Sequence, residues 1–180
     1  ALKHLVESEG FFIKDVKSVP MQGESLRVYV GKTRGSSATA DEFLKKEKEM
    51  GLTNVEAYSG FSDKVVENAK NVKNLLVSLK QQGKKIIGYG AAAKGNTLLN
   101  YFGIGNNLLD YIVDTTPFKQ GLYSPGTHIP VVHPDKIKED MPDYIFILAW
   151  NYADAIIEKE RALREKGVKF IIPVPNVRIV

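Results

Sequence analysis

The residues whose types and spacing suit chemistry form a run rich in glycine and alanine in the second half of the chain. The run Gly88-Tyr89-Gly90-Ala91-Ala92-Ala93 fits the pattern G-x-G-x-x-G/A, and Lys94-Gly95-Asn96-Thr97 follows it directly. Where such a pattern links a strand to a helix, backbone N–H groups at the start of the helix bind phosphate. The run therefore predicts a phosphate-binding turn made by Gly88, Gly90, Ala91, Ala92, Ala93, Lys94, Gly95, Asn96 and Thr97.

Each residue type in this turn has an expected role. Gly88 permits a tight turn, Gly90 lets a phosphate approach the backbone, and the small Ala93 lets the helix pack close to the strand. Lys94 adds a full positive charge beside the phosphate. An alternative stays open, because small residues at a strand–helix junction also serve close packing alone, without any ligand.

Asp114 is the next candidate along the chain. It follows Gly90 by 24 residues, and in dinucleotide enzymes an acidic residue about 20 positions on binds a ribose hydroxyl. A second interpretation is that Asp114 only shapes the turn that leads to Pro117. The residue types do not decide between these two roles.

Two later segments also carry polar side chains at the ends of predicted strands. Loops at the carboxyl ends of parallel strands often carry binding groups, although a solvated loop is the alternative. The candidates for ligand contact in these segments are Lys119, Gln120, Tyr123, Asn151 and Tyr152. Asn151 has a second interpretation as the cap of the following helix, and capping is favoured.

Alternating strands and helices are predicted to position these residues. A strand at 85–90 runs into the glycines, and a helix at 92–102 follows. Further strands are predicted at 109–114, 129–132, 144–149 and 169–173, with a helix at 153–166 before the last of them. Pro130 puts its strand at an edge, since proline cannot donate to a central ladder. The fold class is therefore α/β and Rossmann-like, with a mostly parallel sheet flanked by helices.

The first half of the chain is predicted to be organised differently. Strands at 11–16 and 26–30 form a β-hairpin, which is too small to be stable alone and belongs to a larger sheet. A capping box with Thr39 as N-cap starts a short helix, and a longer helix begins at Ser62 and ends at Gly83. The predicted segments are the hairpin at 1–35, linking helices at 36–83 and the Rossmann-like domain at 84–180.

Composition narrows the classes of function. The 180 residues are 43% hydrophobic, which fits a folded protein. The formal charge of +4 fits an anionic small ligand or no ligand, and it is weak evidence for nucleic acid. The sequence contains no cysteine, which excludes disulfides, thiolate zinc ligands and thiol nucleophiles. His4, His128 and His133 form no metal-binding pattern. Because no run is apolar enough to cross a membrane, we expect a cytoplasmic protein without a membrane partner.

The run from Gly88 to Asn100 resembles the C-terminal domain of SAM-dependent C-methyltransferases that act on nucleotide-linked deoxysugars. Further matches are Tyr111-Ile112-Val113-Asp114, Lys119-Gln120-Gly121, Pro125-Gly126-Thr127-His128-Ile129-Pro130-Val131 and Ala149-Trp150-Asn151-Tyr152. Together the matches span most of residues 55–180, in order. Residues 1–35 resemble the last two strands of the SAM-binding domain of that family.

The resemblance implies a parent enzyme with an N-terminal zinc-binding region, a SAM-binding domain and this domain. Its substrate would be a nucleotide-diphosphate sugar held between the last two. The catalytic base would come from the missing part, so no catalytic residue is expected in this chain, and the isolated chain is expected to be inactive. A homodimer is an open alternative to a monomer.

Two other interpretations of the chain stay open. One is a free-standing module that binds NAD or CoA at the glycine turn, and the other is a structural or dimerisation domain whose turn is empty. Lys94 and Lys119 favour a ligand, and Asp114 favours NAD. The hairpin at 11–30 disfavours a free-standing module, because it needs further strands.

Overall fold

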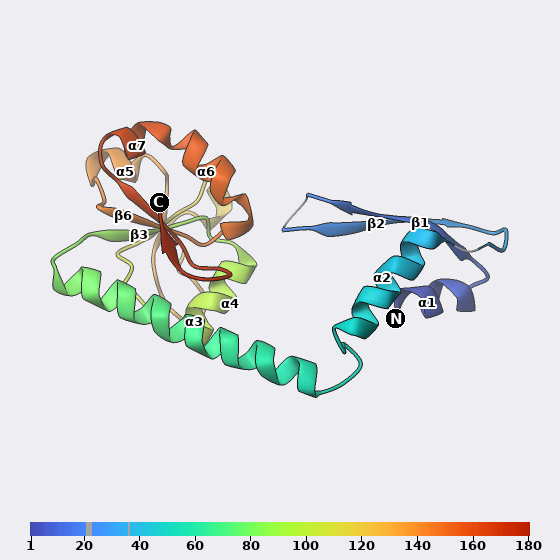
Figure 1. The fold of residues 1–180 in the computed structure, drawn as a ribbon. Coiled ribbons are helices and arrows are strands. Elements are labelled where there is room, and N and C mark those ends of the chain that lie inside the picture. The colour runs from blue at the N-terminus through green and yellow to red at the C-terminus, as the bar shows by residue number, and fades with distance from the viewer. Residues whose placement is uncertain (21–22, 36) are drawn as a thin grey trace. The chain divides into compact units, whose positions relative to one another are not determined.

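The computed structural model describes residues 1–20, 23–35 and 37–180, and these divide into two compact units. The first unit is Ala1–Asp63 and the second is Lys64–Val180. In Figure 1 the first unit runs from blue to cyan, and most of the second runs from green to red. Residue 36, at which the predicted linking segment begins, lies outside the described residues.

The first unit contains the predicted hairpin. Strands β1 (Phe12–Val19) and β2 (Ser25–Gly31) pair antiparallel, with Phe12 opposite Gly31 and Val19 opposite Ser25. Helices α1 (Leu2–Ser8) and α2 (Ala38–Glu49) belong to the same unit. Most side chains of β2 are exposed, whereas both helices of the unit contact β1.

The predicted N-cap of α2 is wrong by two residues. Ser37 is the N-cap, and its hydroxyl accepts a hydrogen bond from the Ala40 N–H at 3.2 Å. The Thr39 hydroxyl instead donates to the Asp15 carboxylate at 2.8 Å and accepts from the Val16 N–H at 3.0 Å. Thr39 therefore joins the helix to strand β1, a tertiary partner that a local capping pattern does not reveal.

The second unit contains the mostly parallel sheet that the sequence predicts. Its strands are β3 (Ile86–Tyr89), β4 (Ile112–Val113), β5 (Val131–Val132), β6 (Tyr144–Ile147), β7 (Lys169–Ile172) and β8 (Arg178–Ile179). Their order is β5-β4-β3-β6-β7-β8, with every pair parallel except β7 and β8. The Rossmann-like α/β prediction is confirmed, and β5 lies at an edge as Pro130 required.

The last strand was missed by sequence analysis, because β8 is only two residues long and antiparallel. The connection between β7 and β8 is held by Asn68, a buried residue of α3 (Glu56–Gln81). The Asn68 side-chain amide donates to the Pro173 carbonyl at 2.8 Å, and its oxygen accepts from the Val177 N–H at 3.1 Å. This bridge joins residues more than a hundred positions apart.

Helices cover both faces of this sheet. On one face, α3 and α4 (Ala93–Phe102) pack against the strands through a single buried cluster that includes Val72, Leu76, Leu99 and Phe146. On the other face, α5 (Lys136–Glu139), α6 (Ala153–Lys159) and α7 (Arg161–Glu165) lie over a second cluster. Ile86 belongs to the first cluster and Ile87 to the second, because successive strand residues point to opposite faces.

Two helix boundaries differ from the prediction. Helix α3 begins at Glu56, six residues before the predicted start at Ser62. The single helix expected at 153–166 is divided at Glu160 into α6 and α7. The Glu160 carboxylate accepts a hydrogen bond from the Tyr89 hydroxyl at 2.7 Å, so the break occurs where the helix is tied to the sheet. Two 3-10 turns complete the unit, η1 (Pro117–Lys119) and η2 (Trp150–Tyr152).

Candidate functional site

The glycine-rich turn connects β3 to α4 at the carboxyl end of the sheet. Gly90 adopts a φ of +85°, which only glycine takes up readily, and the Ala92 N–H donates to the Gly90 carbonyl at 2.8 Å. Ala92 is the N-cap of α4 and makes no side-chain capping bond. The N–H groups of Ala93, Lys94 and Gly95 therefore begin the helix without carbonyl partners inside it. This is the geometry that binds an anion.

Two glycines of the turn have a packing role. Gly88 lies inside β3, and a Cβ placed on it would come within 2.8 Å of the Ile112 side chain. A Cβ on Gly95 would lie 2.7 Å from the Leu148 Cβ and 3.0 Å from the Leu148 carbonyl oxygen. Gly95 rather than the exposed Ala93 thus brings the helix close to the sheet, and the role predicted for Ala93 is wrong. Gly88 likewise makes room for a neighbouring strand rather than permitting a turn.

Asp114 is turned inward and holds the glycine turn. Its carboxylate accepts hydrogen bonds from the Ala91 N–H at 2.7 Å and the Thr116 N–H at 2.8 Å, and the Lys119 ammonium lies 3.3 Å away. Burial raises the pKa of Asp114, but the hydrogen bonds from Thr116, Ala91 and Lys119 outweigh it and hold the pKa below its usual value. The side chain is only 10% exposed.

The two polar residues predicted for the following loop also hold the turn. The Lys119 ammonium donates to the Ala91 carbonyl at 2.9 Å, and the Gln120 amide donates to the Asp114 backbone carbonyl at 2.9 Å. Tyr123, by contrast, is 65% exposed. Lys119 and Gln120 therefore fix the backbone of the site, while Tyr123 stands at its rim.

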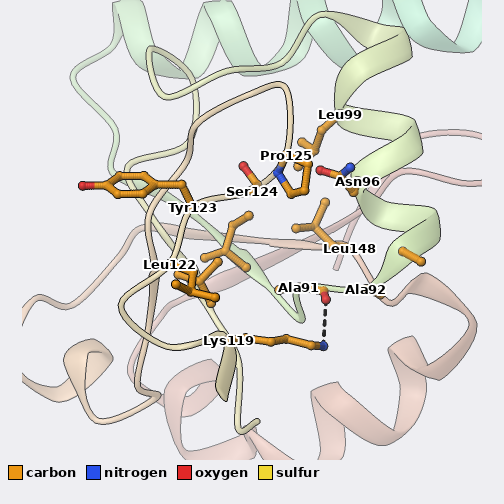
Figure 2. Close-up of a pocket in the computed structure, with 13 residues that line it drawn as sticks. Ala91, Ala92, Asn96, Leu99, Lys119, Leu122, Tyr123, Ser124, Pro125 and Leu148 are labelled. Atoms are coloured by element: carbon orange, nitrogen blue, oxygen red, sulfur yellow. Dashed lines mark hydrogen bonds between the residues drawn. The ribbon is translucent and has the colours of Figure 1, made fainter. Parts of the chain in front are cut away.

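A cavity of about 560 Å³ opens beside the start of α4 (Figure 2). Of the predicted residues it is lined by Ala91, Ala92, Ala93, Asn96, Lys119 and Tyr123. Its other lining residues are Leu99, Ile112, Leu122, Ser124, Pro125, Val131 and Leu148. Sequence analysis missed this second group, because most are apolar residues that carry no chemical signal. In Figure 2 the Asn96 side chain points from α4 toward the loop that carries Ser124 and Pro125.

Asn100 fastens that loop to α4. Its amide donates to the Asn96 carbonyl at 2.9 Å and to the Pro125 carbonyl at 3.0 Å. Gly126 has a φ of +79°, which favours glycine, and a Cβ there would force the Asn100 side chain to move. One hydrogen bond from α4, to the Pro125 carbonyl, therefore holds the part of the loop that lines the cavity.

A smaller hollow of about 310 Å³ lies at the carboxyl ends of β3 and β4, and three more of the predicted residues line it. Gly90, Asp114 and Tyr152 line it together with Tyr89 and Lys159. The Lys159 ammonium donates to the Tyr89 hydroxyl at 3.2 Å. Burial, followed by the hydrogen bond to Glu160, raises the pKa of Tyr89 well above its usual value. Some of the predicted site residues thus line one of two hollows, and the others line neither.

Three of the remaining candidates occupy other positions. The Lys94 ammonium lies over the Trp150 ring, 5.3 Å from its centroid, so its contact is with an aromatic face rather than a carboxylate. The Thr97 hydroxyl donates to the Ala93 carbonyl at 3.3 Å, within the helix. Asn151 is not a cap, because Tyr152 precedes α6 and no side-chain cap is made. The Asn151 amide is instead buried without a hydrogen-bond partner among the described residues.

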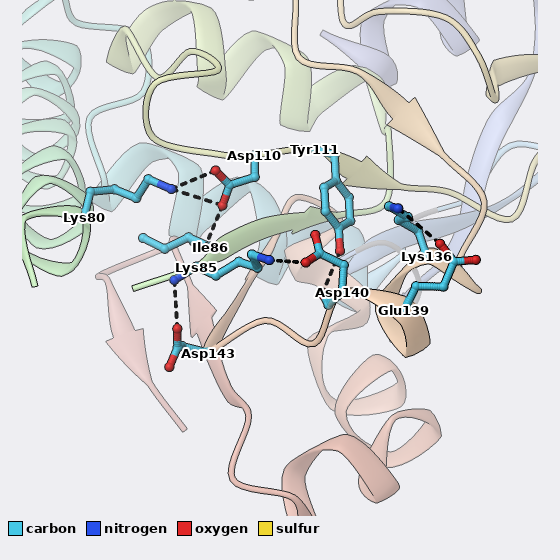
Figure 3. Close-up of polar contacts among 9 residues, drawn as sticks. All are labelled: Lys80, Lys85, Ile86, Asp110, Tyr111, Lys136, Glu139, Asp140 and Asp143. Atoms are coloured by element: carbon cyan, nitrogen blue, oxygen red, sulfur yellow. Dashed lines mark hydrogen bonds and ion pairs between the residues drawn. The ribbon is translucent and has the colours of Figure 1, made fainter. Parts of the chain in front are cut away.

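The amino end of the sheet is closed by ion pairs (Figure 3). The Asp110 carboxylate accepts from the Lys80 ammonium at 2.8 Å and from the Ile86 N–H at 3.2 Å. The Asp143 carboxylate accepts from the Lys85 N–H at 2.8 Å, and the Lys85 ammonium pairs with Asp140. Since these charges are engaged with one another and with strand ends, the carboxyl end is the edge that offers binding groups.

The fold and this edge define a class of protein: a Rossmann-like α/β domain with a cavity beside a glycine-rich turn. The profile of the C-methyltransferase C-terminal domain family matches residues 20–175, and the chain belongs to this family. The chain is 33% identical over 179 residues to "C-methyltransferase NovU" of Streptomyces niveus. This alignment covers 98% of the chain but 43% of that relative, so the chain spans less than half of the relative's length.

Two further findings concern the described residues. No helix among them is both long and apolar enough to span a membrane. Within the same residues, no three or more His, Cys, Asp or Glu side chains gather in a way that would hold a metal ion.

Proposed function

We propose that this domain binds the substrate of a SAM-dependent C-methyltransferase, a nucleotide-linked keto-deoxysugar, with the diphosphate at the start of α4. The observation that carries the proposal is the position of the cavity. It opens beside the helix N-terminus at the carboxyl end of a parallel sheet, where α/β proteins bind their ligands. Family membership supplies the reaction class, and the similarity to a C-methyltransferase agrees with it.

The electrostatics of the turn support an anionic ligand. The N–H groups of Ala93, Lys94 and Gly95 lie at the positive end of the α4 dipole, which favours a nearby negative charge by about 0.3–1 kcal/mol. The Lys94 ammonium is held over the Trp150 ring close to the same turn. A diphosphate would engage both groups, and the ammonium stays available because it is not neutralised by a carboxylate.

The residues of this chain would bind and orient the sugar, and SAM would supply the methyl group. Correct orientation of two reactants is worth about 7–11 kcal/mol of an activation barrier at most, and a binding domain contributes a part of it. We place the SAM site, the base that deprotonates the carbon next to the keto group, and the implied zinc in the remainder of a longer parent protein. The SAM-binding domain is then the partner of this domain in the same chain.

The two alternative functions fare differently. A free-standing NAD module loses its main support, because both oxygens of Asp114 accept hydrogen bonds from the turns beside it. A purely structural domain gains support, because Gly88 and Gly95 have a packing role that needs no ligand. The glycine pattern alone is therefore not evidence of phosphate binding, and a binding measurement has to decide.

Isothermal titration calorimetry of the 180-residue chain with dTDP, a dTDP-sugar, NAD and CoA tests this function. We expect dTDP and its sugar to bind in preference to NAD and CoA, and Lys94→Ala to weaken them by about threefold to tenfold. The matched control is Lys166→Ala, which removes the same charge at the end of α7. Preference for NAD or CoA would replace the proposal with a cofactor module, and binding of none of the four would favour the structural domain.

A further inference from the structure

The side of α3 that packs on the sheet continues beyond it toward the start of the helix. Val65 packs against the buried cluster that contains Val72 and Leu76. Tyr58 and Phe61 precede Val65 by seven and four residues, which places them on the same side of the helix. Both are large and aromatic, yet they are 55% and 66% exposed. Tyr58 and Phe61 form the open face of α3.

The acidic residues of the same turns lie on the opposite side of the helix. Glu56, Asp63 and Glu67 are about half a turn away from the open face. A helix with one apolar and one charged side is typical of a helix that packs on a neighbour, whereas a solvated linker helix is polar all round. The residue pattern of these turns therefore indicates a contact for the open face.

The unit that contains the open face has little core of its own. Among the described residues of Ala1–Asp63, the buried hydrophobic residues are Val16 and Ala40. A folded domain buries many more, because burial of apolar surface has to offset the entropy lost when the chain is ordered. The first unit therefore requires apolar surface from another part of the protein.

The open face is tied to this unit by a short connection. Residues 50–55 link α2 to α3. In this link the Leu52 N–H donates to the Glu47 carbonyl at 3.1 Å, and the Tyr58 hydroxyl donates to the Leu52 carbonyl at 2.7 Å. A partner that completes the first unit therefore lies within reach of Tyr58 and Phe61.

We propose that the open face of α3 packs on an apolar surface of the SAM-binding domain in the same parent protein. The similar C-methyltransferase supports this occupant, because the alignment covers 43% of its length and leaves more than half for other parts. A second copy of the chain is the competing occupant, but it brings the same incomplete unit and supplies no core. The inference rests on the proposed function only in placing a SAM-binding domain in the parent protein.

Hydrogen exchange of the parent protein and of the 180-residue chain, measured by mass spectrometry, tests this contact. Amides of residues 56–63 should exchange at least about tenfold more slowly in the parent, because a covered segment of helix opens less often. Amides of residues 72–79 pack against the sheet in the chain itself, so they should exchange equally in both proteins.

Two variants of the parent protein separate the open face from the rest of α3. Phe61→Ser should abolish most of the protection of residues 56–63. Val66→Ser is the matched control, because Val66 is also 55% exposed but lies on a flank of the helix, away from the open face. It should keep the protection, and an equal loss in both variants would overturn the proposal.

Two other outcomes would also overturn it. One is equal exchange of residues 56–63 in the parent and in the chain, a comparison that decides the question even if Phe61→Ser does not fold. The other is protection that rises with the concentration of the isolated chain, which would assign the open face to a second copy. Phe61→Ser should not change dTDP binding by the chain, so a chain that fails to bind dTDP overturns the proposed function and leaves this contact standing.

Discussion

The Asp114 carboxylate accepts a hydrogen bond of 2.7 Å from the Ala91 N–H, which ties the end of β4 to the turn after β3. The spacing in the sequence makes Asp114 a candidate for ribose binding. In the folded chain its oxygens hold the backbone that forms the start of α4, and Lys119 and Gln120 add to the same network. Several polar residues near the turn thus hydrogen-bond to its backbone, and we expect a ligand to use the backbone N–H groups and Lys94.

Asp114→Asn should destabilise the second unit. The substitution keeps the shape of the side chain but removes its charge and replaces one acceptor by a donor that faces either Ala91 or Thr116. We expect a loss of about 1–3 kcal/mol in the free energy of unfolding, measured by urea denaturation. Asp135→Asn, which changes an exposed aspartate paired with Lys138, should stay within about 0.5 kcal/mol. Equal effects of the two substitutions would show that the Asp114 network is unimportant for stability.

Because of the Asp114 carboxylate, we expect the free energy of unfolding to depend on pH. Because folding lowers the pKa of Asp114, its ionised form stabilises the fold at pH above its unfolded value of about 3.9. This contribution is lost as the pH falls through the lower pKa of the folded state. Urea denaturation at about pH 7 and about pH 3 should show a smaller loss of stability in Asp114→Asn than in the unsubstituted chain. An identical loss in both would contradict the assignment.

Gly95→Ala should disrupt the contact between α4 and the sheet. The new Cβ would lie 2.7 Å from the Leu148 Cβ and 3.0 Å from the Leu148 carbonyl oxygen, and backbone atoms cannot move aside cheaply. We expect a loss of about 1–3 kcal/mol in the free energy of unfolding, seen as a lower Tm. Gly60→Ala is the matched control, because Gly60 lies in α3 and a Cβ added there would meet no neighbouring atom within 4 Å. The Gly60→Ala variant should gain about 0.5–1 kcal/mol in the free energy of unfolding. A gain in Gly95→Ala as well would refute the packing role of Gly95.

Asn151→Leu should leave the free energy of unfolding unchanged or raise it. The buried amide of Asn151 has no partner among the described residues, and an apolar side chain of similar shape removes the cost of burying it. Asn68→Leu is the control, because that buried amide bonds Pro173 and Val177 and its loss should cost about 1–3 kcal/mol. Thermal denaturation compares the two. If Asn151→Leu is as destabilising as Asn68→Leu, Asn151 has a structural role and is not kept for a ligand.

The parts of the fold that depend on local sequence could be predicted from the sequence. Hydrophobic periodicity and glycine positions predicted the strand that leads to Gly90, the helix after it and the further alternating strands. Both signals can be recognised within a short segment of sequence. The edge position of β5 followed from Pro130, because proline lacks an N–H. The family resemblance also rested on contiguous motifs, and the family assignment is confirmed. These features need no knowledge of which distant residues meet.

The tertiary structure decided what depends on distant partners. Ala91 and Asp114 lie on different strand–turn segments, so only the fold reveals their hydrogen bond. The helix contact belongs to Gly95 and not Ala93, because only the position of Leu148 reveals which small residue faces the sheet. The cavity is formed mainly by apolar residues from several separate elements, none of which signals a site alone. Residue types therefore determined the turn and the class of fold, whereas contacts between remote segments determined which of its groups remain free to bind.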